Sequence, residues 1–353
     1  MTNTTFPVYS ISISGMLSWQ LHALNNEGNE GNQSLTRRYY IVEKNDPEPK
    51  YVNGVSGDML KHIQAEHLHR IATDENLALS EGGREFNPDR IGFDFSKKDK
   101  PLQPITEKVK EKGKDGKEKE KDAVVLDKSI DLILNKCVIS DLEGFMFTIK
   151  NDKTLKRESV IEFGAVVGIP SLVKTQSYFH AKYGVENPTP YNTQISSGLY
   201  ATVLNIEAFR IGYNPHNFEY AIDTTERKKR LDALLKSVLY TYMQPNGAKR
   251  NTNLPHPDHF EGVISVSTRR CPAPMISPLA IQEENEDSIT EELKDKKPYV
   301  RQIYRLKNAL NNLNGVDSIH LYEFYSMAQF AEQIQTLIEL AQPWESNNAE
   351  AIE

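Results

Sequence analysis

The chain has 353 residues, of which 38% are hydrophobic and 26% are charged, and its formal net charge at pH 7 is −7. This length can bury a complete core, as one large or two modest domains. No apolar run approaches the ~20 residues of a membrane-spanning helix, and residues 1–10 lack the features of a signal peptide. Two cysteines, Cys137 and Cys271, are too few for a disulfide framework or a zinc site. We therefore expect a cytoplasmic protein that does not bind membranes.

Charge is unevenly distributed along the chain. Ten lysines, interleaved with Asp and Glu, lie between Lys97 and Lys121. Seven carboxylates and one lysine lie between Glu283 and Asp295, and the rest of the chain is close to neutral. The negative total therefore does not exclude a local basic groove that binds nucleic acid.

The first predicted element is a strand over residues 6–21, where Ser and Ile alternate with the two-residue period of a half-covered sheet. The amide- and glycine-rich stretch His22–Gln33, HALNNEGNEGNQ, is typical of a surface turn. A short hairpin is expected from Tyr39 to Val55. Ser56 is then in position to cap a helix.

This helix has one predicted apolar side, with the polar residues Lys61 and Gln64 elsewhere on its surface. The apolar side carries, at spacings of three and four, Leu60, Ile63, His67 and Ile71.

Residues 74–125 are predicted to form an insertion after the first helix. Its Lys/Glu-rich segment, residues 96–122, has low complexity and no apolar period. We expect a flexible, solvated loop there, with direct contact to a polyanion as the alternative. A helix over Asp127–Cys137 and a short strand over Gly144–Lys150 follow.

Two apolar strands are predicted at residues 158–169 and 198–213. The segment between them, residues 170–197, is rich in proline, glycine and polar residues and contains the cluster Tyr178, Phe179 and His180. Long excursions inside compact domains are uncommon unless they have a function.

Asp223 and Glu226 predict the start of a second long helix, whose apolar residues from Leu231 to Tyr242 follow the helical period. A strand over Phe260–Thr268, an acidic linker and a last helix from about Tyr322 to Ala341 complete the chain. The order strand, helix, strand, strand, helix, strand is the ferredoxin-like pattern. It predicts an α+β fold with the topology of RNA-recognition-motif (RRM) modules, although topology alone does not establish a function.

The sequence shows none of the searched catalytic motifs. It contains no G-x-S-x-G, P-loop or G-x-G-x-x-G sequence and no recognisable nucleophile and base, so we predict neither an enzyme nor a cofactor. The histidines from His62 to His69 do not follow H-E-x-x-H, and His256 and His259, although suitably spaced, have no cysteine nearby to complete a set of ligands. No metal site is predicted.

Basic residues recur at predicted helix and strand ends, where they suit phosphate contact. They are Arg37 and Arg38, Lys61, the run Arg227–Arg230, Lys249 and Arg250, and Arg269 and Arg270. Each group by itself is more often a solvated surface feature. The aromatic residues of 170–197 suit stacking on unpaired bases, although such rings more often pack a loop onto its own domain.

Several stretches in this order resemble the DevR family of CRISPR-associated proteins, the repeated backbone (Cas-seven) subunit of type I Cascade complexes, most like type I-B. They are SISGMLSWQLHALNNEGNEGNQ…TRR, SGDMLKHIQAEHL, SVIEFGAVVGIPS, YFHAKYG with SSGLYATVLNIEAFRIG, and GAKRNTNLPHPDHFEGVISVS. The likeness covers about residues 6–280.

The resemblance implies an RRM-like palm over residues 1–73 and 158–353, a finger-like insertion over 74–157 and a thumb-like β-hairpin within 170–197. It further implies a non-catalytic subunit that polymerises along the spacer of a CRISPR RNA and presents it for pairing with target DNA. The implied partners are CRISPR RNA, the target DNA strand, copies of the chain in a helical filament, and the large, small, repeat-handle-binding and repeat-processing endonuclease subunits of Cascade.

The resemblance also implies roles for residues. Lys61 matches a lysine of the family that contacts the RNA backbone, and Tyr178, Phe179 and His180 are candidates for displacing a base. The RNA-binding candidates are Asn25, Asn26, Arg37, Arg38, Ser56, Lys61, His62, Gln64, Lys249, Arg250, Arg269 and Arg270. Glu27 and Glu30 are expected to face basic residues of a neighbouring copy.

Two other functions stay open. One is an RNA-cleaving relative that uses a loop aspartate, for which Asp58 and Asp94 are only loosely suitable. The other is a structural or regulatory oligomer without guide RNA.

Overall fold

The structure is a computed structural model. It describes the chain except for residues 1–3, 25, 44–45, 96–101, 113–117, 150–153, 182–183, 185, 187–189, 248–251, 280–289 and 346–353. The chain divides into two compact units: unit 1 comprises residues 1–64, 162–206 and 238–353, and unit 2 comprises residues 65–161 and 207–237. Unit 2 thus joins the whole of the predicted insertion 74–157 to a later segment, 207–237.

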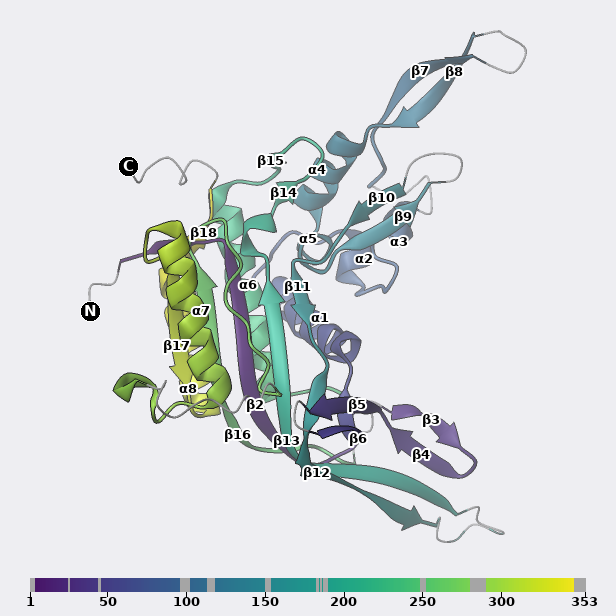
Figure 1. The fold of residues 1–353 in the computed structure, drawn as a ribbon. Coiled ribbons are helices and arrows are strands. Elements are labelled where there is room, and N and C mark those ends of the chain that lie inside the picture. Colours follow the sequence, from purple (N-terminus) through teal and green to yellow (C-terminus); the bar gives the residue numbers. More distant parts are fainter. Residues whose placement is uncertain are drawn as a thin grey trace. The chain divides into compact units, whose positions relative to one another are not determined.

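Unit 1 is built on a large sheet with the strand order β17-β16-β2-β13-β12-β6-β5, in which each neighbouring pair is antiparallel (Figure 1). The strands on this path are β2 (Ser10–His22), β5 (Arg38–Glu43), β6 (Asp46–Val55), β12 (Val166–His180), β13 (Tyr191–Ile206), β16 (His256–Ser267) and β17 (Ile319–Phe324). Three short strands join it off the path, namely β3 (Asn26–Glu30), β4 (Gln33–Thr36) and β11 (Ile161–Phe163). A separate parallel pair joins β1 (Phe6–Val8) to β18 (Ala341–Pro343).

Helices α7 (Pro298–Asn314) and α8 (Met327–Leu340) lie wholly in unit 1, whereas α1 (Gly57–Asp74), β11 and α6 (Thr224–Met243) continue into unit 2. The further elements of unit 2 are α2 (Glu81–Arg84), α3 (Ile91–Phe95), β7 (Thr106–Lys112), β8 (Glu118–Val124), α4 (Leu126–Lys136), α5 (Val138–Glu143), β9 (Phe145–Thr148), β10 (Thr154–Arg157), β14 (Tyr213–Asn214) and β15 (Glu219–Tyr220). The described residues thus form a mixed α/β fold with eight α-helices and a large, mainly antiparallel sheet. Within them, no helix has both the length and the apolar character to cross a membrane.

The prediction of a half-covered first strand is wrong, because both faces of β2 are buried. On one face, the segment 271–276 covers the serines: Ser12 Oγ donates to the carbonyl of Ala273 at 3.1 Å, and the Ala273 amide donates to Ser10 Oγ at 2.8 Å. Serine alternates with isoleucine here because the serine face packs against backbone polar groups. A period-two pattern cannot distinguish this arrangement from contact with water.

An aromatic cluster forms the core on the opposite face. Phe260 of β16 stacks on Tyr242 of α6 at a ring-centroid distance of 4.9 Å, and Phe330 of α8 lies 4.9 Å from Phe260 and 4.8 Å from Phe324. All four side chains are buried. The sheet is therefore covered on both faces, and exposed strand surface is found mainly where strands extend past this core.

Several element boundaries differ from the predictions. The apolar stretch 158–169 is two strands, because β11 ends at Phe163 and β12 begins at Val166. The last helix begins at Met327, and residues 319–324 form strand β17 instead. Helix α7 was not predicted, although it has Pro298 in its first turn and ends at Gly315 with a φ of +67°, both common helix boundary signals.

The Lys/Glu-rich segment of unit 2 was expected to be a loop, but its described residues form the antiparallel hairpin β7–β8 (Figure 1). The register places Lys110 opposite Glu120 and Lys108 opposite Asp122, and Lys108 Nζ lies 3.5 Å from Glu120. Opposite charges across an antiparallel pair stabilise it. Alternating charge can therefore specify a hairpin where an apolar period is missing.

Candidate nucleic-acid interface

The backbone of Arg37 is fixed by a buried chain of hydrogen bonds that crosses the sheet. His22 Nε2 lies 2.7 Å from the Tyr200 hydroxyl, which donates to Asn53 Oδ1 at 3.0 Å. The Asn53 amide donates to the Arg37 carbonyl at 3.1 Å, and the Gly54 amide donates to the same oxygen at 3.0 Å. The three side chains come from β2, β13 and β6, so the position of Arg37 depends on the whole centre of the sheet.

The direction of these bonds determines the protonation of His22. Because the Tyr200 hydroxyl donates its proton to Asn53, His22 must donate to it through Nε2–H. Burial lowers the pKa of His22 to about 3 and raises the pKa of Tyr200 well above its usual value, so both groups stay neutral near pH 7. The hydrogen bonds from His22 to Arg37 are therefore intact at physiological pH.

The stretch that begins at His22 is a hairpin and not only a surface turn. Strands β3 and β4 pair through Glu30 and Gln33, and Gly31 between them has a φ of +57°, a conformation that favours glycine. Glu27 Oε1 lies 3.7 Å from Nε of Arg37 in the same chain, and its contact with a neighbouring copy stays a prediction. This hairpin thus places an acidic side chain next to Arg37, a candidate RNA-binding residue.

The predicted excursion 170–197 is a two-stranded arm in which β12 and β13 pair from Val173–Gly198 to His180–Tyr191. A register irregularity between Gly168 and Val173 marks where the arm leaves the core of the sheet. In Figure 1 the arm extends away from the body of the sheet, next to the β3–β4 hairpin.

Strand β4 braces this arm. Asn192 and Thr193 pair in parallel with Gln33 and Ser34. Gln194 Oε1 accepts hydrogen bonds from the amide of Thr36 at 3.0 Å and from its hydroxyl at 3.2 Å. The arm and the β3–β4 hairpin are thus joined by backbone and side-chain bonds immediately before Arg37.

The three base-displacing candidates all lie on this arm and are exposed. Phe179 is 68% exposed and Tyr178 is 39% exposed. His180 is engaged with the opposite strand, because its Nε2 lies 2.8 Å from Thr193 Oγ1 and its ring stacks on Tyr191. Tyr178 and Phe179 therefore present the more accessible rings for stacking.

The start of α1 holds four candidates in different environments. Ser56 is buried and caps the helix, since its Oγ accepts the Met59 amide at 3.2 Å. Lys61 is half-buried and His62 is exposed. Gln64 was expected on the helix surface but is buried, so its side chain faces the protein interior.

The remaining candidates are not gathered at one place. Asn25, Lys249 and Arg250 lie outside the described residues, and Asn26 begins β3. Arg269 and Arg270 follow the end of β16 that pairs with Ser10, whereas Arg37 is linked to His22 at the other end of β2. At 3.2–3.4 Å per residue, these two ends of β2 are about 40 Å apart.

The basic run Arg227–Arg230 does not form a phosphate-binding surface, because Arg227 and Arg230 are buried. Arg230 and Arg157 both pair with Asp141, at 2.9 and 2.5 Å. Asp141 also accepts the amide of Gly212. These bonds join α6, β10, α5 and the segment after β13 within unit 2.

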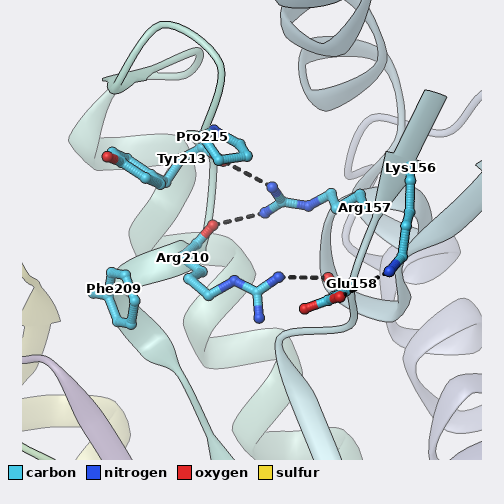
Figure 2. Close-up of a pocket in the computed structure, with 7 residues that line it drawn as sticks. All are labelled: Lys156, Arg157, Glu158, Phe209, Arg210, Tyr213 and Pro215. Atoms are coloured by element: carbon cyan, nitrogen blue, oxygen red, sulfur yellow. Dashed lines mark hydrogen bonds and ion pairs between the residues drawn. The ribbon is translucent and has the colours of Figure 1, made fainter. Parts of the chain in front are cut away.

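A pocket of about 390 Å³ lies beside this network and is lined by Lys156, Arg157, Glu158, Phe209, Arg210, Tyr213 and Pro215 (Figure 2). Its guanidinium groups bond to protein carbonyls: Arg157 donates to Tyr213 and Arg210 at 2.7 and 2.6 Å, and Arg210 donates to Glu158 at 2.9 Å. Burial lowers the pKa of Arg157, and Asp141 opposes that shift. These arginines hold unit 2 together.

Residues outside the predicted set complete the interface. Asn53, Gln194 and Tyr200 position Arg37 and the arm, and Asn53 and Tyr200 are polar residues with mainly apolar neighbours in the sequence. Such residues are the available signal, since a polar side chain within a buried strand needs a hydrogen-bond partner. Which partner it finds depends on sheet register.

The family model described as "CRISPR-associated negative auto-regulator DevR/Csa2" matches residues 13–288. No curated protein matches the sequence. A solved chain titled "CRISPR RNA-guided surveillance complex, pre-nicking" is similar at 14% identity and a TM-score of 0.48, over 92% of this chain and 99% of that chain. Another, titled "CRISPR RNA-guided surveillance complex", is similar at 12% identity and a TM-score of 0.47, over 93% and 98%.

Proposed function

Because the chain belongs to the CRISPR-associated DevR/Csa2 family, we propose that it is a non-catalytic subunit that binds CRISPR RNA. In this proposal, copies of the chain polymerise along the guide spacer, form the backbone of a Cascade complex and present the guide for pairing with target DNA. The other Cascade subunits are its further partners.

The topology supports an RRM-like palm as the core of this subunit. The chain contains β2, α1, β12, β13, α6 and β16 in this order, with further elements inserted between some of them. Their strands are ordered β16-β2-β13-β12 in the sheet. This is the ferredoxin-like arrangement that RRM modules share. We assign the β12–β13 arm as the thumb and the insertion that contains β7–β8 as the finger.

The observation that carries the proposal is the joined pair of hairpins next to Arg37. The arm presents exposed Tyr178 and Phe179, and Gln194 fixes it to the strand that leads into Arg37. Cations track a phosphate backbone and aromatic rings stack on bases of any sequence. One hydrogen-bonded edge of the sheet therefore supplies both contacts.

This chemistry suits a subunit that must accept any spacer. Phosphate contacts position a nucleic acid without reading its sequence, and an RNA-guided complex delegates sequence recognition to base pairing. Arg37, Arg38 and Lys61 are the proposed phosphate ligands. Tyr178 and Phe179 are the proposed base-displacing residues.

The position of Asp94 supports the absence of cleavage. Asp94 is buried, and its Oδ1 accepts the amide of Gly82 at 2.9 Å. A carboxylate in this position is not accessible to an RNA strand. The second aspartate considered, Asp58, is exposed in the first turn of α1, where a carboxylate stabilises the helix terminus.

Co-purification with guide RNA tests the proposal. The full chain is expressed together with a CRISPR array, and the bound nucleic acid is extracted and sequenced, while labelled RNA is incubated with the protein to detect cleavage. We expect discrete repeat-derived RNA and intact label. RNA-free protein whose elution is unchanged by added guide would refute the proposal, and specific cleavage would favour the RNA-cleaving alternative.

The Lys61→Glu variant tests the placement of the phosphate path. Reversing this charge is expected to weaken RNA binding and to reduce its salt dependence, because a phosphate contact is lost. Lys307→Glu is the matched control, since Lys307 is also a half-buried helix lysine but lies on α7. Equal affinities of the two variants would show that the path does not pass Lys61.

A further inference from the structure

Two tyrosines form an exposed stack on the β5–β6 ribbon. Tyr40 and Tyr51 lie directly opposite each other in the antiparallel register. Their ring centroids are 4.6 Å apart with an interplanar angle of 24°, and the Arg38 guanidinium lies 5.3 Å from the centroid of Tyr51. The three side chains thus make one continuous stack of two rings and a cation.

This stack lies on the outer face of the ribbon. On the other face Val52 is buried, and Tyr39 packs so closely on Gly54 that an added Cβ would lie 2.7 Å from its ring. Tyr40 is 71% exposed, Tyr51 is 52% exposed, and Val42 is also exposed. Tyr51 contacts both neighbours of the stack, so the ring of Tyr40 offers the largest open surface.

Pairing of the two rings stabilises the ribbon, but it leaves apolar surface in water on β5, the last strand in the sheet order. Exposed apolar surface on an edge strand favours aggregation and commonly marks a binding surface. The adjacent cation favours an anionic partner. An aromatic face next to a cation is the combination that binds single-stranded nucleic acid.

The chain connects this stack directly to the proposed interface. Arg38 follows Arg37, whose carbonyl is held by Asn53 and Gly54 of the same ribbon. Strand β6 continues into Ser56 and the start of α1, and it pairs with the base of the arm at Val166. Strand β5 begins at Arg38, two residues after β4 ends at Thr36, and Figure 1 shows the two hairpins in succession along the chain.

We propose that the Arg38–Tyr51–Tyr40 stack is a second base-binding platform, on which one unpaired base of the bound RNA stacks against Tyr40 while Arg38 contacts its phosphate chain. The platform is independent of base identity and separate from the rings of the arm. This inference rests on the proposed RNA-binding function.

A binding cycle with and without bases tests the platform. The full chain and its Tyr40→Ala variant are titrated against labelled 12-nucleotide oligouridylate and against an abasic ribose-phosphate chain of equal length. Tyr40→Ala is expected to weaken oligouridylate binding about 5- to 150-fold, which corresponds to about 1–3 kcal/mol for one stacked base. On the abasic chain the variant and the wild type should bind equally, because no base is present to stack.

Two further variants separate stacking from folding. Tyr40→Trp keeps an aromatic face and should retain wild-type affinity. This result would show that the loss in Tyr40→Ala comes from the missing aromatic face and not from a general loss of ribbon structure. Tyr240→Ala removes an exposed tyrosine from α6 and should bind both ligands like the wild type.

The outcomes distinguish this inference from the proposed function. If the wild type binds RNA but Tyr40→Ala binds oligouridylate equally well, or loses affinity equally for both ligands, the platform is refuted and the proposed function stands. If Tyr40→Ala changes only self-association in sedimentation, the surface is a contact between copies and the platform is refuted. If the wild type binds neither ligand, both proposals fail.

Discussion

The substitution Tyr200→Phe tests whether the buried hydrogen-bond chain positions Arg37. It removes one hydroxyl while keeping the ring that packs 5.9 Å from Trp19. Without this hydroxyl, His22 Nε2–H and Asn53 Oδ1 lose partners that lie at 2.7 and 3.0 Å. A buried polar group without a partner costs about 1–3 kcal/mol, so with two such groups we expect the free energy of unfolding to fall by about 2–6 kcal/mol.

Urea unfolding followed by tryptophan fluorescence measures this loss, because Trp19 and Trp344 both lie in unit 1. Tyr242→Phe is the matched control: its hydroxyl is also buried but has a single partner, Thr202 Oγ1, at 2.9 Å. A hydroxyl left behind on a threonine can turn to a backbone carbonyl, so this control should lose about 1 kcal/mol. RNA affinity should fall for Tyr200→Phe at urea-free, fully folded conditions and remain unchanged for Tyr242→Phe. Equal unfolding free energies and equal affinities of the two variants would show that the buried hydrogen bonds of Tyr200 do not position Arg37.

Three further predictions concern His22, the buried Asp141 and the brace at Gln194. The pKa of His22 is about 3 in the folded state, below its ordinary value of 6.5, so protonation favours the unfolded state below pH 6.5. As the pH falls from 6.5 to 5, the free energy of unfolding of the wild type should decrease by up to about 1.4 kcal/mol per pH unit more than that of His22→Gln. Urea midpoints that change in parallel with pH for the two proteins would contradict this. Asp141→Asn leaves Arg157 and Arg230 buried without a carboxylate and should destabilise unit 2 by about 3–5 kcal/mol, measured by circular dichroism. Asp232→Asn is the control, because the partly exposed pair of Asp232 with Lys228 contributes only about 0–1 kcal/mol. Similar losses of stability in the two variants would argue against the Asp141 network. Gln194→Leu removes the acceptor of the Thr36 amide and should speed hydrogen exchange in β3–β4, whereas unchanged protection would show that the brace is not needed.

Local sequence signals predicted the starts of helices α1 and α6 well. Ser56 and Asp223 accept hydrogen bonds from the amides of Met59 and Glu226, as their positions indicated. The apolar side of α1 is buried at Leu60 and Ile63. These features depend on residues within one or two turns, so the sequence pattern contains the information directly.

Features that depend on distant partners were not predictable in this way. Gln64 was predicted on the helix surface because it is polar, yet it lies four residues after Leu60, on the side of α1 that is buried. Arg230 looks like part of a basic patch because its neighbours are basic, but Asp141, 89 positions earlier, fixes it in the interior of unit 2. A charge run on a helix therefore needs its tertiary partners before it can be assigned to phosphate binding.

The candidate interface shows the same division. The sequence pattern indicated Arg37, Arg38 and the aromatic excursion, because basic pairs and aromatic clusters are visible in one dimension. The residues that hold them, Tyr200 and Gln194, were missed because their importance arises from register between strands. Tyr40 and Tyr51 are eleven positions apart and become a stack only through the pairing of β5 with β6.

The dependence of assembly size on spacer length tests the central claim most directly. The full chain is mixed with guide RNAs whose spacers differ only in length, and the mass of each complex is measured by analytical ultracentrifugation. The account predicts that bound mass increases in steps of one 40.2 kDa chain as the spacer lengthens, with the RNA recovered intact. A mass that is independent of spacer length, or an oligomer that forms equally without RNA, would contradict it.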